Sequence, residues 1–352
     1  MRIGLYGMPA AGKTYILDHI DFLDVYAGST RLKEINPRFN ELNDEEKTNV
    51  RKELATALRS KDFFVMDGHY AFGDNVVFTE DDGALYDVFL YLYIDPDVLA
   101  QRMIASSKNA NFLAYDIAEW QKAEIRHLRA FCHRNEKDFY VIDNPPENVF
   151  RDIGDILEFV TDIKAGYSCY SFAQRCASEI LSAASSDTVM LFDGDKTLTR
   201  ADSSYKVFGY TTHLFDGNYY TGYQTWKQSK EFETFSFDVP VITEGVLNKN
   251  VIEAITGDVF ILTSGHSRVW GAIAKQLGIP YYCGAAMSAE TKFFIVKRLK
   301  RAGKRVIAYG DSISDYYMLK AADEGYIVAK TDGSFSRSLE GLNLEGLKIV
   351  RT

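Results

Sequence analysis

The chain has 352 residues, of which 46% are hydrophobic and 25% are charged, and its formal net charge at pH 7 is −9. This length is sufficient for two domains, and the composition is that of a globular protein. The longest strongly apolar run, residues 88–94, is too short to cross a bilayer, and the N-terminus lacks the apolar core of a signal peptide. We therefore expect a cytoplasmic protein with no membrane partner.

The negative charge is concentrated in the first half of the chain. Residues 1–165 contain 19 lysine and arginine residues against 29 aspartate and glutamate residues, whereas the remainder contains 21 against 20. A surface that follows a long polyanion should be basic. The balance therefore argues against extended DNA or RNA, although a local basic groove would be compatible with it. Nothing in the sequence indicates an oligomeric state.

Apolar strand-like runs alternate with helical stretches in the first half, a pattern typical of a parallel α/β sheet. The predicted strands are residues 2–6, 62–66, 88–94 and 139–143. The predicted helices are residues 13–20, 43–60, 96–102, 117–132 and 149–163. A weakly marked junction at residues 164–168 suggests one domain over residues 1–165 and a second over residues 166–352.

The second half predicts another α/β unit, with a Rossmann-like parallel sheet. Its predicted strands are residues 188–192, 259–263, 306–309 and 325–328. We interpret approximately residues 200–257 as a small inserted cap. Aromatic side chains there could stack on a base or sugar ring, or form the core of the cap itself. They are Tyr205, Phe208, Tyr210, Phe215, Tyr219, Tyr220, Tyr223 and Trp226.

A glycine-containing loop follows the first predicted strand and has the spacing of a phosphate-binding P-loop. Its sequence is Gly7-Met8-Pro9-Ala10-Ala11-Gly12-Lys13-Thr14. Such a loop presents several backbone N–H groups to one anion at a helix N-terminus. We expect the loop backbone, including Gly7, Ala10, Ala11 and Gly12, to bind the phosphates of ATP or GTP. Lys13 would reach the β- and γ-phosphates, and the Thr14 hydroxyl would ligate Mg²⁺.

With two further motifs, the first 160 residues resemble nucleoside-monophosphate-kinase-like P-loop kinases. The motifs are Asp67-Gly68 after a strand, and Ile94-Asp95-Pro96-Asp97 leading to Gln101-Arg102. The resemblance implies that Asp67 positions Mg²⁺ or the acceptor, and that His69 and Tyr70 border the acceptor. The alternative interpretation of Asp67 is a turn residue at the end of a strand.

The lid of this half departs from the kinase pattern. Phosphoryl transfer requires cations beyond the P-loop lysine, and this family supplies them from an arginine-rich lid. The corresponding residues 105–115 contain only Lys108, while Arg126 and Arg129 lie on the next helix, each also readable as a solvated surface charge. Arg31 and Arg38 are candidates to bind an acceptor phosphate.

The second half contains four ordered motifs with the residues of an aspartate-based phosphatase. They are Asp193-Gly194-Asp195-Lys196-Thr197, Thr263-Ser264-Gly265, Lys292, and Gly310-Asp311-Ser312-Ile313-Ser314-Asp315. Asp193 ends a strand, where its carboxylate can attack phosphorus. Asp195 can protonate the leaving oxygen and then activate water. A cluster of four carboxylates is strongly repulsive without a cation, so we expect Mg²⁺ among them.

These motifs resemble those of haloacid-dehalogenase-like phosphatases. The resemblance implies that Ser264, or less readily Thr263, binds the transferring phosphoryl group, and that Lys292, or alternatively Lys297, neutralises it. It also implies that Thr197 holds Asp195 in place. The implied metal ligands are Asp193, Asp311, Asp315 and the backbone carbonyl of Asp195. Lys196 departs from the family, because many members have glycine at that position.

The sequence therefore predicts a bifunctional enzyme, a Mg²⁺-dependent phosphatase joined to an ATP-dependent kinase for a nucleotide or small phosphorylated substrate. An N-terminal P-loop kinase followed by this phosphatase is also the order in phage-type polynucleotide kinase-phosphatases, so repair of nucleic acid ends is an alternative. Charge disfavours that alternative, as does the absence of an obvious acidic general base within residues 25–35. A third possibility is that the P-loop half only senses nucleotide and regulates the phosphatase.

Overall fold

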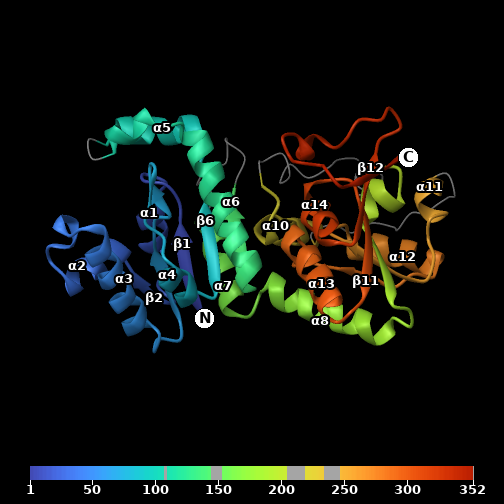
Figure 1. Cartoon of the computed structure of the whole chain (residues 1–352), viewed down its shortest axis with the longest axis horizontal. Coiled ribbons are helices and arrows are strands. Elements are labelled where there is room, and N and C mark those ends of the chain that lie inside the picture. The colour runs from blue at the N-terminus through green and yellow to red at the C-terminus, as the bar shows by residue number, and fades with distance from the viewer. Residues whose placement is uncertain (107–108, 144–152, 204–218, 234–245, 352) are drawn as a thin grey trace. The chain divides into compact units, whose positions relative to one another are not determined.

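The computed structural model describes residues 1–106, 109–143, 153–203, 219–233 and 246–351. The chain divides into two compact units, Met1–Tyr167 and Ser168–Thr352, each with its own parallel sheet (Figure 1). Within the described residues, no helix is both long enough and apolar enough to cross a membrane.

The first unit is built on a five-stranded parallel sheet with the order β2-β3-β1-β6-β7. These strands are β1 (Arg2–Tyr6), β2 (Asp24–Tyr26), β3 (Phe64–Asp67), β6 (Val88–Leu92) and β7 (Asp138–Ile142). Every residue of β6 and β7 is buried, as expected for parallel strands covered on both faces. Because β1 lies between β3 and β6, the loop after β1 leaves the sheet where successive strands pass to opposite sides. Ligands of open α/β sheets bind at such positions.

Helices surround this sheet largely where the sequence predicts them. They are α1 (Lys13–Leu17), α2 (Gly28–Ile35), α3 (Asp44–Leu58), α4 (Glu80–Leu85), α5 (Pro96–Ile104), α6 (Ile117–Asn135) and α7 (Ile153–Lys164). The helix predicted at residues 43–60 is confirmed as α3, and a capping box between Asn43 and Glu46 fixes its start. The short β2 and the hairpin of β4 (Ala71–Phe72) and β5 (Asn75–Val76) were not predicted, because two or three residues show no periodicity.

The second unit contains a six-stranded parallel sheet with the order β10-β9-β8-β11-β12-β13. The strands are β8 (Thr188–Phe192), β9 (Asp258–Thr263), β10 (Tyr281–Cys283), β11 (Arg305–Gly310), β12 (Glu324–Ala329) and β13 (Lys348–Arg351). Numbered by their appearance in the unit, this order is 3-2-1-4-5-6, the doubly wound arrangement. Its switch point lies between β8 and β11. The four predicted strands are confirmed, and the two edge strands were missed.

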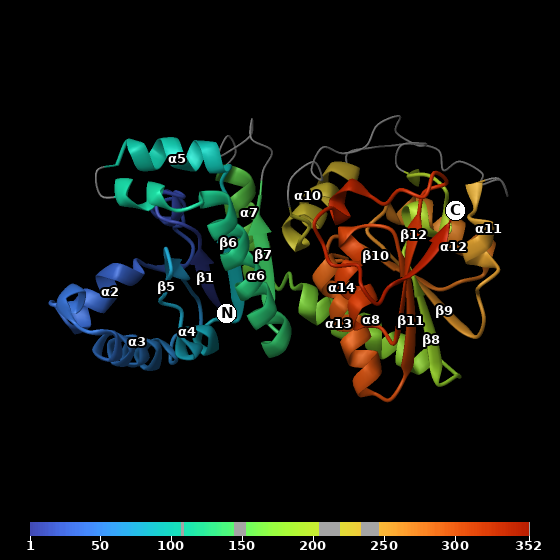
Figure 2. The same ribbon diagram turned by 45° about the horizontal axis from the view of Figure 1, so that its top comes forward.

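Alternating side chains of β8 divide the core of this unit between the two faces of the sheet. Val189 and Leu191 pack with α8 (Cys169–Ala183), α13 (Ala289–Arg301) and α14 (Ile313–Ala321). Met190 and Phe192 pack on the other face with α11 (Lys249–Ile252) and α12 (Ser267–Leu277). Figure 2 shows these helices on the two sides of the strands. The sheet is therefore held rigidly between two layers, which fixes the ends of β8 and β11.

Candidate active site

Two of the expected acidic residues meet at the switch point of the second sheet. Asp193 directly follows β8 and Asp311 directly follows β11, and these strands are paired through Phe192 and Tyr309. The Asp193 backbone N–H donates to the Tyr309 carbonyl oxygen at 2.9 Å, which extends the ladder to the end of both strands. The two carboxylates are thus positioned by the sheet itself.

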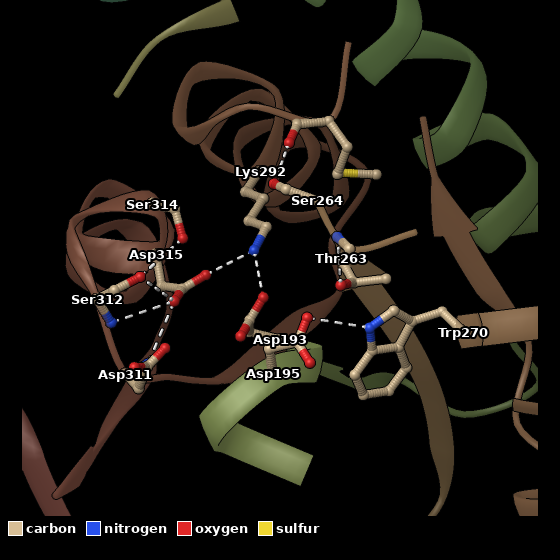
Figure 3. A network of polar contacts seen from close by, with 12 residues as sticks. Asp193, Asp195, Thr263, Ser264, Trp270, Lys292, Asp311, Ser312, Ser314 and Asp315 are labelled. Atoms are coloured by element: carbon tan, nitrogen blue, oxygen red, sulfur yellow. Dashed lines mark hydrogen bonds and ion pairs between the residues drawn. The ribbon is translucent and has the colours of Figure 1, made fainter. Parts of the chain in front are cut away.

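Lys292 links Asp193 to Asp315 of the fourth motif (Figure 3). Its ammonium group donates to Asp193 Oδ1 and to Asp315 Oδ1, each at 2.7 Å. The side chains of Lys292 and Asp315 are completely buried. Lys297, the alternative lysine, is exposed on the same helix α13 and has no place in this network. The geometry therefore selects Lys292.

Asp315 is held by the start of α14 as well as by Lys292. Its Oδ2 accepts from the backbone N–H groups of Asp311 at 3.2 Å and Ser312 at 3.3 Å, as part of a capping box. A Cβ at Gly310 would lie 2.3 Å from the Cβ of Asp315, so only glycine allows this approach. The spacing between Gly310 and Asp315 in the fourth motif therefore follows from the packing of the N-terminal cap of α14 against the end of β11.

Three carboxylates form a site whose charge fits a divalent cation. Oxygen atoms of Asp193, Asp311 and Asp315 all lie within 4.8 Å of one another. Burial, then the charge of Asp315, raises the pKa of Asp193 to about 7 although Lys292 opposes the shift. Burial, then the charges of Asp193 and Asp315, also raises the pKa of Asp311. One ammonium group does not balance three carboxylates, and oxygen donors are those that Mg²⁺ prefers.

Asp195 lies beside this cluster and is held through both carboxylate oxygens. Its Oδ1 accepts from the Ser203 backbone N–H at 2.7 Å. Its Oδ2 accepts from the Trp270 indole N–H at 3.2 Å (Figure 3). Burial, then the charge of Asp202, raises the pKa of Asp195 to about 6. Two hydrogen-bond donors therefore fix the orientation of the Asp195 carboxylate, which is not one of the three clustered carboxylates.

Sequence reasoning missed Trp270. The indole is fully buried on α12, and a Cβ at either Gly194 or Gly265 would come within 2.4 Å of it. The glycines of the first two motifs therefore leave room for this ring against the loop of Asp195. Those two glycines, with a tryptophan on the helix that follows, were the signal in the sequence.

The hydroxyl residues of these motifs lie near the cluster with different partners. Ser264 Oγ donates to the Met287 carbonyl oxygen at 2.5 Å, while Thr263 Oγ1 accepts from the Gly265 N–H at 3.0 Å. The Thr197 hydroxyl is buried and has no hydrogen-bond partner among the described residues. The role expected for Ser264 thus remains a prediction, and in this structure its hydroxyl is engaged with the core.

Lys196 has a strained backbone in the loop between Asp195 and Thr197. Its φ of 58° lies in the left-handed region, which costs a residue other than glycine roughly 1–2 kcal/mol. Its ammonium group lies 3.0 Å from Asp202 Oδ2, with the lysine side chain 51% exposed. A pair this exposed contributes about 0–1 kcal/mol. The ion pair alone does not offset the strain.

Helix α10 (Gly222–Glu233) lies in the described part of the segment that the sequence predicts as a cap. Tyr223 and Trp226 are buried and stack with ring centroids 5.9 Å apart, which favours a packing role. Thr225 Oγ1 donates to the Ala285 carbonyl oxygen at 2.8 Å. Burial, then the charges of Asp202 and Asp193, raises the pKa of Tyr220. Tyr205, Phe208, Tyr210 and Phe215 lie outside the described residues.

In the first unit, the loop after β1 has the backbone of an anion-binding loop. Gly12, with φ of 99°, precedes α1, and Ala10 has φ of 63°. A Cβ at Gly7 would lie 2.9 Å from the Leu92 carbonyl oxygen. The Lys13 ammonium group donates to the carbonyl oxygens of Gly7 at 2.5 Å and Met8 at 3.0 Å. Thr14 is exposed at the first turn of the helix.

The charges of two acidic side chains, Asp67 and Glu124, act on the pKa of Lys13. Burial lowers the pKa of Lys13 to about 8, while the charges of Asp67 and Glu124 oppose that shift. Asp67 Oδ1 accepts from the Gly28 N–H at 2.7 Å. Glu124, which sequence reasoning missed, is buried and accepts from Tyr91, Trp120 and the Ala71 N–H. It thereby ties the chain segment that follows His69 and Tyr70 to helix α6.

The arginines expected near the lid differ in their surroundings. Arg102 Nη1 donates to the Ala11 carbonyl oxygen at 3.3 Å, so it reaches the P-loop. The interpretation of Arg129 as a surface charge was wrong: it is buried, with its guanidinium 5.7 Å from the Phe139 ring centroid, because it lies on the inner face of α6. Arg126 and Arg38 are exposed. Arg31 pairs with Glu34 at 2.7 Å and covers the Tyr26 ring. Lys108 lies outside the described residues.

Removing the buried ammonium group should destabilise the metal-free protein. We expect Lys292→Met to lower the stability of the chain by about 3–5 kcal/mol in EDTA at pH 8, because it leaves buried carboxylates unpaired. Lys297→Met removes an exposed lysine from the same helix and serves as the control. Thermal unfolding measures both, and equal transition temperatures for the two variants would contradict the predicted charge balance.

Comparison with known proteins agrees with this geometry for the second unit. A family model for haloacid dehalogenase-like hydrolases matches residues 247–323, which include Ser264, Lys292, Asp311 and Asp315. Asp193 and Asp195 precede the matched range in the sequence. They lie beside it in the fold, because β8 pairs with β9 and β11, which both belong to the matched range. No curated protein sequence matches the chain.

Solved structures show only distant likeness. Shikimate kinase from Acinetobacter baumannii, in complex with shikimate, is 17% identical with a TM-score of 0.33, over 46% of this chain and 94% of that one. Shikimate kinase from Aquifex aeolicus is 17% identical with a TM-score of 0.31, over 47% and 100%. A hydrolase of the haloacid dehalogenase family from Salmonella enterica serovar Typhi is 15% identical with a TM-score of 0.27, over 41% and 62%.

The first unit is defined by its own strand order and loop. That unit combines a parallel sheet of order β2-β3-β1-β6-β7 with a P-loop after the central strand. The second unit combines the family match with the four motifs around one carboxylate cluster. The chain therefore joins an N-terminal α/β unit that carries a P-loop to a C-terminal unit in which residues 247–323 match the haloacid dehalogenase-like hydrolases.

Proposed function

We propose that the second unit is a phosphomonoesterase that works through an aspartyl phosphate. The observation that carries this proposal is the contact of buried Lys292 with Asp193 at the switch point of the sheet. An Asp193 carboxylate oxygen attacks phosphorus, the bond from phosphorus to the ester oxygen breaks, and Asp195 donates its proton to that oxygen. Water then attacks phosphorus, gives its proton to Asp195, and the bond to Asp193 breaks.

Asp193, Asp311 and Asp315, with the Asp195 backbone carbonyl, are the residues that would hold Mg²⁺. The ion would neutralise charge on the phosphoryl oxygens during transfer. Lys292 supplies the same kind of stabilisation from the protein side. Ser203 and Trp270 hold Asp195 through hydrogen bonds to both of its carboxylate oxygens. These different partners support different roles for the two residues, with Asp193 as the nucleophile and Asp195 as the general acid and base.

We further propose that the first unit is an ATP-dependent kinase for a nucleotide or a small phosphorylated compound. The loop conformation and the position of Lys13 support binding of nucleoside triphosphate phosphates. The approach of Arg102 to Ala11 adds one cation beside the loop. The acidic balance of residues 1–165 supports a small acceptor rather than a polynucleotide. Both units are then Mg²⁺-dependent phosphate-transfer sites in one chain.

The phosphatase proposal is tested by a single isosteric change. Asp193→Asn should abolish hydrolysis of p-nitrophenyl phosphate, because an amide is a poor nucleophile. The variant should still bind ATP, since the P-loop belongs to the other unit. Asp187→Asn, at an exposed aspartate just before β8, is the matched control. Retention of the hydrolysis rate in Asp193→Asn would overturn the proposed mechanism.

The kinase proposal is tested with labelled ATP in the Asp193→Asn background, where the phosphatase does not remove the product. We expect label on mononucleotides or small phosphorylated compounds and none on 5′-hydroxyl oligonucleotides. Lys13→Met should abolish transfer, and exposed Lys33→Met should not. Label only on oligonucleotide ends would favour repair of nucleic acid ends. ATP binding without any labelled acceptor, together with a phosphatase rate that changes with ATP, would favour a nucleotide sensor.

Trp270→Phe keeps the ring packing and removes the indole N–H from Asp195. If Asp195 is held less firmly, it protonates the leaving oxygen less efficiently, and this slows most the release of leaving groups that need a proton. We expect the kcat for phenyl phosphate to fall about tenfold, and that for p-nitrophenyl phosphate, whose leaving group needs no proton, by less than about threefold. Steady-state kinetics on the two substrates give the comparison. An equal decrease for both would mean that Trp270 acts only through stability.

A further inference from the structure

Lys196 carries a side chain where the backbone favours glycine. Among the described residues, Ala10, Glu136 and Lys196 are the ones other than glycine with positive φ. Ala10 belongs to the P-loop and Glu136 ends helix α6. Lys196 ends no helix, and its exposed ion pair with Asp202 does not compensate for its conformation. Strained residues of this kind occur preferentially at functional sites.

The position of Lys196 gives the hydrolase site a second cation. It follows Asp195 directly, and the charges of Asp202, Asp311 and Asp195 raise its pKa although burial lowers it. Its side chain is 51% exposed, whereas that of Lys292 is fully buried. Lys292 is engaged by Asp193 and Asp315. Lys196 is the accessible cation in the same loop.

An ammonium group has three N–H donors, and Asp202 occupies one direction around that of Lys196. A further anion can therefore approach without displacing Asp202. Among the described residues, the charged groups that act most strongly on Lys196 are the carboxylates of Asp202, Asp311 and Asp195, which would repel an anionic substrate group placed next to them. Lys196 would therefore attract an anionic group of the substrate other than the reacting phosphate.

We propose that Lys196 binds a second anionic group of the substrate, a carboxylate or a phosphate on the leaving-group side of the scissile bond. This inference depends on the proposed phosphatase function and deepens it by giving the substrate class. The preferred substrates are small phosphomonoesters with at least one further negative charge. Lys196 is then a specificity residue and takes no part in the chemical step.

The test compares matched compounds as inhibitors of p-nitrophenyl phosphate hydrolysis. One pair is glycerol 3-phosphate and 3-phosphoglycerate, which tests an added carboxylate. The other is adenosine 5′-monophosphate and adenosine 3′,5′-bisphosphate, which tests an added phosphate. In at least one pair, we expect the compound with the added anionic group to bind the natural protein about tenfold more tightly than its partner. The ratio of inhibition constants corrects for any change in the hydrolysis itself.

Four variants separate binding from backbone effects. Lys196→Gly relieves the strain and Lys196→Asn tolerates the same φ, and both should bring the ratio to within about twofold of one. Lys196→Arg keeps both charge and strain and should preserve the ratio. Asp202→Asn removes the competing partner and should preserve or increase it. Because glycine suits this conformation, Lys196→Gly should unfold at no lower temperature than the natural protein.

The inference is overturned if neither pair shows a preference in the natural protein, or if Lys196→Gly leaves the preference unchanged. An effect of Asp202→Asn equal to that of Lys196→Gly would also overturn it, because Lys196 would then only anchor Asp202. Failure of the proposed function has a different signature, namely no hydrolysis that depends on Asp193. In that event the same four compounds are compared by calorimetric dissociation constants, which test Lys196 independently of turnover.

Discussion

The buried ammonium group of Lys292 between Asp193 and Asp315 is the contact on which the C-terminal site depends. A charged lysine is rarely buried completely unless carboxylates pair with it, and here two of them do so at 2.7 Å. This contact requires β8 beside β11, the first turn of α13 facing both strands, and Gly310 beneath Asp315. Any shift of one element would leave a charge unpaired in the core.

The same contact leaves the site short of positive charge. Three carboxylates share one lysine, and burial raises the pKa values of Asp193 and Asp311, so a cation that binds oxygen would relieve the repulsion. Phosphate monoesters bring still more negative charge to this position. A site that already concentrates carboxylates can accept such a substrate only when cations lie around it. This requirement links the metal proposal, the role of Lys292 and the exposed Lys196.

The phosphate site proposed for the first unit would bind its anion in another way. Its donors are mainly backbone N–H groups of a loop with positive φ at Ala10 and Gly12, and only Lys13 contributes a charge within the loop. Lys13 is buried among carbonyl oxygens and lies in the field of Asp67 and Glu124. A phosphate site made of backbone has a local sequence signature. An acceptor site made of scattered side chains does not.

Sequence reasoning was accurate where a feature is local. The buried strands, the P-loop and the four motifs of the second unit all lie in short segments, and the α/β class of both units is confirmed. The choice of Lys292 over Lys297 required the structure, because both lie on one helix and only the contact with Asp193 separates them. Trp270 and Glu124 were missed for a related reason. Each acts through a partner more than 50 residues away in the sequence.

Edge strands such as β10 and β13 were also missed, because short segments that are partly exposed lack a continuous apolar run. The burial of Arg129 could not be read from its neighbours in the chain, since α6 presents alternate faces to solvent and to β7. Predictions that depend on which face of an element is covered therefore need the tertiary structure.

Chemical trapping of the intermediate is the most direct test of the central claim. The protein with Mg²⁺ is mixed with p-nitrophenyl phosphate, quenched in acid and reduced with borohydride, which converts an aspartyl phosphate to homoserine. Peptide mass spectrometry should find homoserine at position 193 only when substrate is present. Phosphate release without any modification at position 193, or modification at another aspartate, would contradict the assignment of Asp193 as the nucleophile.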